Sequence, residues 1–202
     1  MLTIACNAKC RQDTREILVE VYLMIVREAC LDDASAIARV HVDTWRTTYG
    51  GIMPEEYLAR LSYEQREHSW RQTLTTASKD NHFIYVIEDT DSQIVGFADG
   101  GLERTGNPIY TGELYAIYIL DTYQGQGLGY RLTLKVVERL FEAGLDSMLV
   151  WVLANNPACR FYEALGGQKV YEQIVERSGT KLKELAYGWK NTIEVITRCS
   201  RY

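Results

Sequence analysis

A glycine-rich stretch in the second half of the chain most strongly limits the folds open to it. The segment Tyr123–Gly129 (YQGQGLG) carries three glycines within five residues. A long apolar run, Glu113–Leu120, precedes it, and apolar residues at helical spacing follow over 127–142. The pattern predicts a strand, a loop and a helix in succession, with glycines that allow a tight turn directly before the helix N-terminus.

Loops of this kind bind phosphate groups. Successive glycines let several backbone N–H groups point at one site, and the positive end of the helix dipole adds attraction for an anion. A tight turn without a ligand is the alternative, and three glycines that open a helix favour phosphate binding over it. Two nucleotide patterns do not fit. Tyr130 stands where the dinucleotide fingerprint needs glycine, and the sequence has no Gly-Lys-Ser/Thr.

Residue patterns predict the other elements as well. Strands are expected at 25–28, 82–88, 94–102, 113–120, 147–153, 168–176 and 182–190. Helices are expected at about 32–49, 55–61, 62–76, 127–142 and 157–165. This order is typical of an α/β chain with a mixed sheet and helices on its faces. We expect an N-terminal appendage over 1–23, either an extra helix or an extension before a start at Met24, one folded domain over 24–190 and a C-terminal tail or short terminal element over 191–202.

Composition excludes several classes of partner. The 202 residues are 47% hydrophobic and 24% charged, as in ordinary globular domains. The net charge of -5 argues against nucleic acid, which needs a basic face. Apolar stretches are too short to cross a bilayer, and the N-terminus lacks a signal peptide's apolar block, so we expect no membrane partner and a cytoplasmic location. The five cysteines are irregularly spaced, which favours free thiols over a metal site.

Two motifs flank the strand expected at 147–153. The segment Gln124–Gly129 reads Q-x-x-G-x-G, and Asn155, Ala158, Phe161 and Tyr162 read N-x-x-A-x-x-F-Y. Together they resemble the GNAT superfamily of acetyl-coenzyme A-dependent N-acetyltransferases, whose pyrophosphate loop has the pattern Q/R-x-x-G-x-G/A and whose second signature is N-x-x-A-x-x-F-Y. The motifs stand in the family's order, one helix and one strand apart, and the resemblance covers about 24–189. Gly167 departs from it, since the family has an aromatic residue there.

The resemblance implies a fold and a co-substrate. The fold is a GNAT-like mixed, mostly antiparallel sheet of about seven strands, flanked by about four to five helices. The co-substrate is acetyl-coenzyme A, and no metal is needed. Backbone amides would hold the pyrophosphate at Gln124, Gly125, Gln126, Gly127, Leu128 and Gly129. The pantetheine arm would bind along Ile117, Tyr118 and Ile119 and to the Asn155 side chain. Arg160 is a candidate for a coenzyme phosphate, although an exposed helical arginine is the simpler interpretation.

The resemblance also implies direct attack of an amine on the bound thioester. Tyr162 would protonate the departing thiolate, since a phenol has a pKa not far above that of a thiol. The alternative is that Tyr162 is only a packing aromatic residue. Glu113, at the start of the central strand, is the candidate base for the amine. The alternative, to which we give equal weight, is that Glu113 is a surface residue that merely begins the strand.

The acceptor wall is expected at the end of the first helix and on the central strand. Its candidates are Trp45, Tyr49 and Tyr115. Trp45 and His41 lie on the apolar stripe of the helix, so core packing is their default interpretation.

The leading hypothesis is therefore an enzyme that acetylates a primary amine on a small molecule or peptide. A non-catalytic acyl-coenzyme A binding or sensing module is the alternative, and Tyr162 argues against it because a binder needs no proton donor. The sequence leaves the acceptor's identity open, and it leaves a homodimer open as well.

Overall fold

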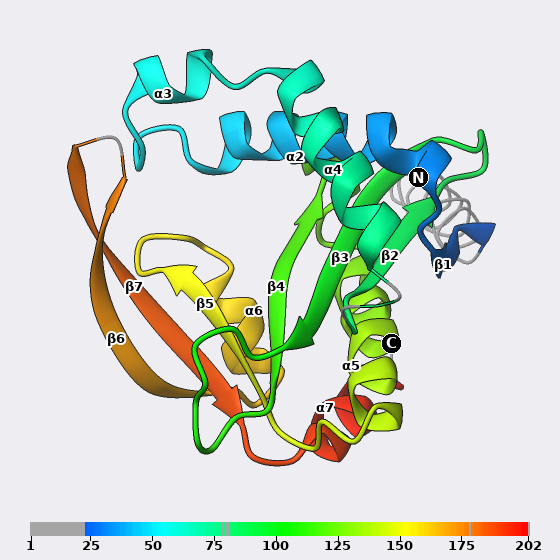
Figure 1. Ribbon diagram of the computed structural model, residues 1–202, viewed down its shortest axis with the longest axis vertical. Helices are drawn as coiled ribbons and strands as arrows, with labels where there is room; N and C mark the ends of the chain where they lie inside the picture. Colours follow the sequence, from blue (N-terminus) through cyan, green and yellow to red (C-terminus); the bar gives the residue numbers. More distant parts are fainter. Residues whose placement is uncertain (1–22, 78, 80, 178, 202) are drawn as a thin grey trace, which may run out of the picture.

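The computed structural model describes residues 23–77, 79, 81–177 and 179–201. Most of the expected appendage, 1–22, lies outside the described residues. A seven-stranded sheet forms the centre of the molecule, in the order β1-β2-β3-β4-β5-β7-β6 (Figure 1). Its strands are β1 (Ile25–Glu28), β2 (Phe83–Glu88), β3 (Ile94–Leu102), β4 (Gly112–Ile119), β5 (Met148–Leu153), β6 (Gln168–Arg177) and β7 (Thr180–Trp189).

Neighbouring strands pair antiparallel, except that β4 and β5 run parallel. Parallel strands need a crossover connection, which the long helix after the glycine-rich loop supplies. The expected mixed, mostly antiparallel sheet of seven strands is thus confirmed.

The sheet opens between β4 and β5. These two strands pair only at Gly112–Met148 and Glu113–Leu149. Beyond that point β4 keeps its pairing with β3, and β5 pairs with β7 as far as Leu153. Among the described strands, none therefore pairs with the backbone of β4 from Leu114 onward on the side that faces β5.

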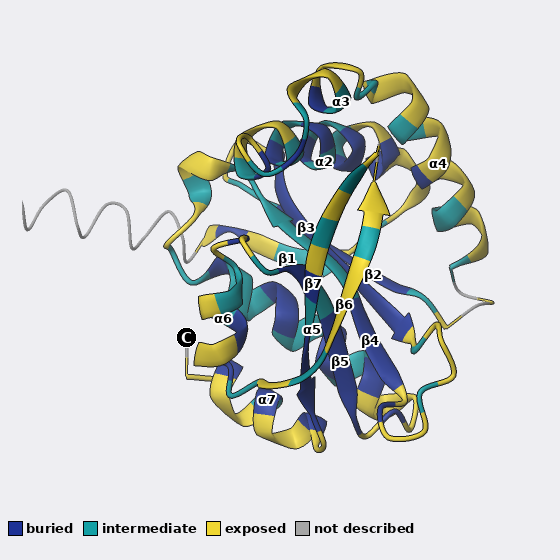
Figure 2. Ribbon diagram, turned by 90° about the vertical axis from the view of Figure 1, so that its left-hand side faces the viewer, coloured by how far each residue is buried: buried dark blue, intermediate teal, exposed yellow. Residues whose placement is uncertain are grey.

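Helices cover both faces of the sheet (Figure 1). The α-helices are α2 (Ala34–Thr48), α3 (Glu55–Ala59), α4 (Tyr63–Thr76), α5 (Leu128–Glu142), α6 (Cys159–Ala164) and α7 (Thr192–Cys199). Under α5 lies the larger apolar core, which includes Leu132 and Val136, and under α2 lies a second core with Ile37 and Phe97. Figure 2 shows the buried residues gathered in the central strands, whereas β6 is largely exposed.

The C-terminal segment expected as a tail holds helix α7. Asn191 begins it, since its side-chain oxygen accepts from the Ile193 N–H at 3.0 Å. Val195 and Cys199 are buried in the main core beside α5. These two residues, four apart, give a short amphipathic helix whose apolar side completes the core. The described residues thus contain six α-helices where four to five were expected.

One irregularity in β4 bears on the site. Asp99 pairs with Ala116 and Gly100 with Leu114, so Tyr115 is an extra residue in β4. Such a β-bulge bends the strand and re-aims its side chain.

Among the described helices, none is long and apolar enough to cross a membrane.

Candidate active site

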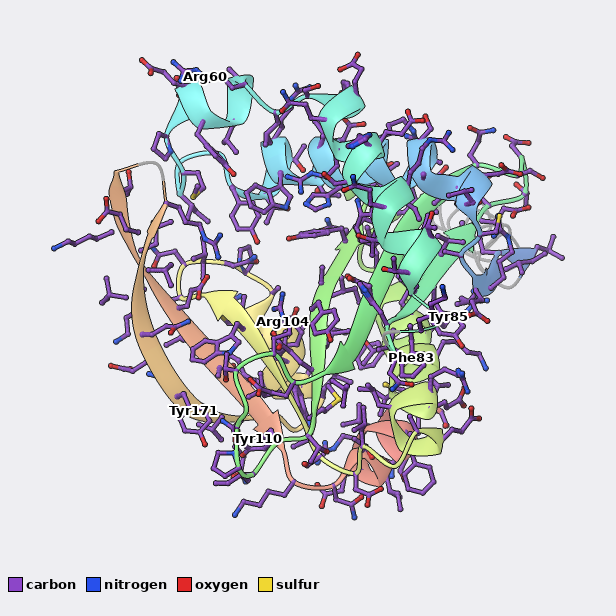
Figure 3. All side chains as sticks on the ribbon, viewed as in Figure 1. Arg60, Phe83, Tyr85, Arg104, Tyr110 and Tyr171 are labelled. Atoms are coloured by element: carbon purple, nitrogen blue, oxygen red, sulfur yellow. The ribbon has the colours of Figure 1, made fainter. Side chains whose placement is uncertain are left out.

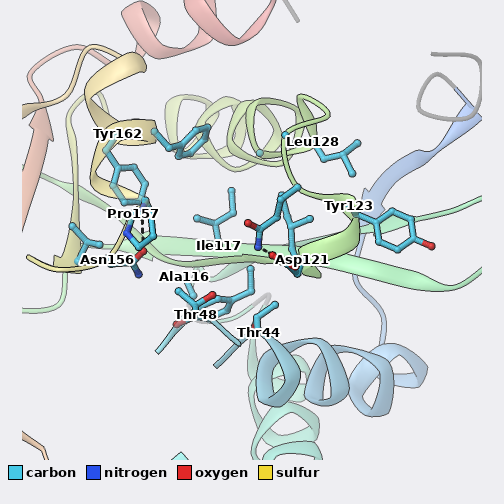
Figure 4. Close-up of a pocket in the computed structure, with 18 of the residues that line it drawn as sticks. Thr44, Thr48, Ala116, Ile117, Asp121, Tyr123, Leu128, Asn156, Pro157 and Tyr162 are labelled. Atoms are coloured by element: carbon cyan, nitrogen blue, oxygen red, sulfur yellow. Dashed lines mark hydrogen bonds between the residues drawn. The ribbon is translucent and has the colours of Figure 1, made fainter. Parts of the chain in front are cut away.

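A cavity of about 940 Å³ lies where β4 and β5 diverge (Figure 4). Its volume is that of a pocket for a sizeable organic ligand. The structure brings most of the expected site residues to its wall. These are Tyr49, Tyr115, Ile117, Tyr118, Ile119, Gln124, Gly125, Gln126, Gly127, Leu128, Gly129 and Tyr162.

The glycine-rich loop forms one end of the cavity. Gly125 and Gly127 have φ angles of 74° and 80°, and no atom lies within 4 Å of where a Cβ would stand. Such left-handed backbone favours glycine. The side chains of Gln124 and Gln126 donate backward, to the carbonyls of Ile119 at 2.8 Å and Thr122 at 3.1 Å. The glutamines thus brace the loop from within.

Helix α5 begins at this loop without a side-chain cap, because its N-cap residue is Gly127. Gly127 has no side chain to cap the first turn, and the helix dipole places partial positive charge there. The combination suits a pyrophosphate. The open edge of β4 suits the peptide-like amides of a pantetheine arm, so the cavity fits acetyl-coenzyme A.

Tyr162 lies on α6, in the wall across β4 from the C-terminal end of α2 (Figure 4). Its side chain is buried and packs against the rings of Phe161 and Tyr187, at centroid distances of 5.5 and 6.0 Å. Burial raises the pKa of its phenol well above the usual value. Tyr162 therefore keeps its proton throughout the neutral range.

The second motif presents a different asparagine from the one expected. Asn155 is exposed and does not line the cavity, whereas Asn156 is buried and does. The Asn156 Oδ1 atom accepts from the Ala158 N–H at 2.9 Å, and its Nδ2 donates to the Tyr49 hydroxyl at 3.3 Å. Asn156 stands directly before Pro157, and an asparagine before a proline is a local signal for such a turn. The motif specifies only Asn155 and so does not include this signal.

Two further expected residues lie outside the cavity lining. Arg160 is exposed on α6. Trp45 packs edge-on against Tyr49, at 4.9 Å between ring centroids, and supports the wall from behind. Helical spacing places Trp45 on the apolar stripe, in agreement with its default interpretation as a packing residue.

Glu113 is not among the residues that line the cavity. Its side chain is buried and forms a two-pronged ion pair with Arg104, in which the Nε–Oε2 distance is 3.0 Å. Arg104 is labelled in Figure 3. Arg104 also lies over the ring of Tyr115, 4.4 Å from its centroid. Such a paired carboxylate holds a loop on the strand and is poorly placed to accept a proton from a ligand.

Glu113→Gln is therefore expected to leave kcat for amine acetylation within about twofold. Arg104→Met should instead lower the free energy of unfolding by about 1–2 kcal/mol, because it leaves Glu113 buried without its cation; the partial exposure of Arg104 keeps the loss below that of a fully buried pair. Steady-state kinetics and urea unfolding measure the two effects. Two results together would restore Glu113 as the base: a hundredfold loss of kcat in Glu113→Gln, and a wild-type kcat that rises with pH.

Sequence reasoning missed three threonines of α2 that line the cavity, which are Thr44, Thr47 and Thr48. Thr44 and Thr48, one helical turn apart on α2, face the cavity (Figure 4). Of the lining side chains in the part of the chain that the structure describes, only Asp121 carries a charge. Among the described residues, no group of three or more His, Cys, Asp or Glu side chains is arranged to hold a metal ion.

Comparison with solved structures identifies the fold. An N-acetyltransferase from Staphylococcus aureus Mu50 superposes with a TM-score of 0.66 and 18% identity, over 84% of this chain and 98% of that one. The PaiA N-acetyltransferase from Thermoplasma acidophilum, solved in complex with coenzyme A, gives 0.62 and 17%, over 80% and 97%. The fold is thus that of these N-acetyltransferases.

Sequence comparison establishes the family. The model of the family described as FR47-like protein matches residues 103–175, which hold β4, the glycine-rich loop and α6. The chain is also 40% identical over 179 residues to YuaI of Bacillus subtilis (strain 168), an uncharacterised N-acetyltransferase. That match covers 89% of this chain and all of YuaI. The chain therefore belongs to the GNAT superfamily and is an acetyl-coenzyme A-dependent acetyltransferase.

Proposed function

We propose that the chain moves an acetyl group from acetyl-coenzyme A to a primary amine by direct attack in a ternary complex. One observation carries the proposal: the loop Gln124–Gly129, the open edge of β4 and the phenol of Tyr162 all line a single cavity. We call this loop the proposed pyrophosphate cradle. Cavity walls on two sides allow coenzyme and acceptor to be bound together. None of the cysteines is needed as an acyl carrier.

The reaction divides among few residues. The N-terminus of α5, at Gly127–Gly129, would hold the pyrophosphate, and Ile117–Ile119 would hold the arm. A neutral amine attacks the thioester carbonyl, the new C–N bond forms as the C–S bond breaks, and Tyr162 gives its proton to the departing thiolate. The proton lost by the amine leaves through water, and Tyr162 is reprotonated from solvent.

A non-catalytic acyl-coenzyme A sensor is the second candidate. It would share the cradle, and so coenzyme binding alone does not separate the two. The discriminating measurement is release of free thiol from acetyl-coenzyme A upon addition of an amine. A sensor would bind the coenzyme and release none.

Calorimetric titration with acetyl-coenzyme A, with NAD and ATP as controls, tests the binding half. Gly127→Asp is expected to weaken acetyl-coenzyme A binding by more than tenfold, since it places a carboxylate where the pyrophosphate would bind. Gly144→Asp is the matched control: Gly144 also has a left-handed φ, 77°, with open space around a Cβ, and lies outside the cavity. Both changes should cost about 1 kcal/mol of stability.

Micromolar binding of acetyl-coenzyme A in the wild type and in Gly144→Asp, with loss only in Gly127→Asp, supports the assigned loop. Tighter binding of NAD, or equal affinities in the two variants, would refute it.

A further inference from the structure

The acceptor side of the cavity has a well-fixed phenol at its centre. Tyr49 follows the last turn of α2: its N–H donates to the Trp45 carbonyl at 3.0 Å, and its own carbonyl accepts from the N–H groups of Ile52 and Met53 at 3.0 and 2.9 Å. Its side chain is 8% exposed. It packs in a small apolar cluster with Met53 and Leu58. Backbone and packing together therefore fix the position of its hydroxyl.

A hydrogen bond across the cavity aligns that hydroxyl. Asn156 donates to it at 3.3 Å from the turn after β5, while Ala158 holds the other end of the same amide. The bond joins residues 107 positions apart, one on the acceptor wall and one on the wall that carries α6. Burial chiefly, and then the nearby phenol of Tyr49, raise the pKa of Tyr162. Tyr49 and Tyr162 thus flank the same part of the cavity.

The charges of the side chains that line the cavity restrict the charge that an acceptor can carry. Among the described residues that line the cavity, Asp121 alone is charged, and it belongs to the short helix Asp121–Tyr123 next to the glycine-rich loop. On the acceptor side the lining offers hydroxyl groups and aromatic rings, including Thr44, Thr48 and Trp151. A polycation would lose its hydration there without a countercharge. A single amine would be driven toward its neutral form, which is the form that attacks.

From these observations we infer that Tyr49, aligned by Asn156, is the residue that positions the acceptor's amino group, and that the acceptor is a monoamine with an uncharged body. The inference rests on the proposed function. The Tyr49 hydroxyl accepts a hydrogen bond from the neutral amine and turns its lone pair toward the thioester carbonyl. Acceptors with several cationic groups are disfavoured because, among the described residues, the acceptor side of the lining holds no carboxylate.

Thiol release with phenethylamine and spermidine as probes tests the acceptor class. The wild type is expected to acetylate phenethylamine with at least tenfold higher kcat/KM than spermidine. Tyr49→Phe should raise the KM for phenethylamine roughly three- to tenfold, the range of one neutral hydrogen bond, and leave the calorimetric Kd for acetyl-coenzyme A within about twofold. Tyr57→Phe is the matched control, since Tyr57 packs near Trp45 and lies outside the cavity lining.

Each failure has a separate meaning. A wild type that binds no acetyl-coenzyme A refutes the proposed function itself. Binding with spermidine preferred overturns the acceptor class, whereas binding with neither probe acetylated is the result expected of the sensor and counts against the proposed transfer itself. Equal KM values in Tyr49→Phe and Tyr57→Phe, with both variants melting as the wild type does, overturn the role of Tyr49.

Discussion

Tyr162→Phe is expected to lower kcat by roughly two to three orders of magnitude and to leave the Kd for acetyl-coenzyme A within about twofold. Phenylalanine keeps the ring contacts with Phe161 and Tyr187 and removes only the hydroxyl. The departing thiolate would then have no proton donor, whereas the cradle that binds the coenzyme is unchanged. Stopped-flow or steady-state thiol release measures kcat, and calorimetry measures the Kd.

Tyr187→Phe is the matched control. Tyr187 is a buried phenol of the same core whose hydroxyl donates to Glu163 at 2.8 Å, outside the cavity lining. The Tyr187→Phe variant should keep kcat within about threefold.

Because burial raises the pKa of Tyr162, the wild-type pH profile should show no loss of activity from ionisation of the Tyr162 phenol below pH 10. Full turnover by Tyr162→Phe across this range would remove the residue from the mechanism.

His41 is expected to make the fold sensitive to acid. Its ring lies among the aromatic side chains of α2 and α4 and of the sheet, 5.0 Å between centroids from Tyr118, and its Nδ1 accepts from Trp70 Nε1 at 3.3 Å. Burial, and to a lesser extent the charge of Arg66, lower the pKa of His41 from 6.5 to about 3. The imidazole is thus neutral in the folded protein, in agreement with the prediction of a core histidine.

The direction of the effect follows from proton binding. Between pH 6.5 and pH 3 the unfolded chain binds a proton at His41 that the folded chain does not bind, so stability falls as the pH falls through this window. The slope is about 1.4 kcal/mol per pH unit, which gives a loss of about 3 kcal/mol at pH 4.5 relative to the value above pH 6.5.

His41→Gln should remove this pH dependence, because glutamine can still accept from Trp70 and does not titrate. Urea unfolding of the wild type and the variant between pH 7.5 and pH 4.5 gives the difference directly. His68→Gln, at an exposed position on α4, is the control and should keep the wild-type slope. Parallel curves for the wild type and His41→Gln would contradict the buried neutral imidazole.

The order of the elements could be predicted from the sequence because it depends on local patterns. Helix α5 follows from apolar residues at helical spacing after the glycines, and the loop before it follows from the backbone that Gly125 and Gly127 allow. Ser62 shows the same locality, since its hydroxyl accepts from the Gln65 N–H at the start of α4, as the capping pattern predicts. Helix α7 was missed because eight residues at the chain end give a weak periodic signal.

The sequence by itself determined the glycine-rich loop, the central strand and the position of Tyr162 in the second motif, because each is encoded within a few adjacent residues. Only the tertiary structure decided which side chains meet across the cavity. The spacing of the second motif favours Asn155, yet the turn before Pro157 aims Asn156 inward. Glu113 is drawn away from the cavity by Arg104, nine residues earlier, and Tyr49 meets Asn156 only because α2 and the end of β5 fold together. Such contacts depend on long-range packing, which local sequence patterns do not encode.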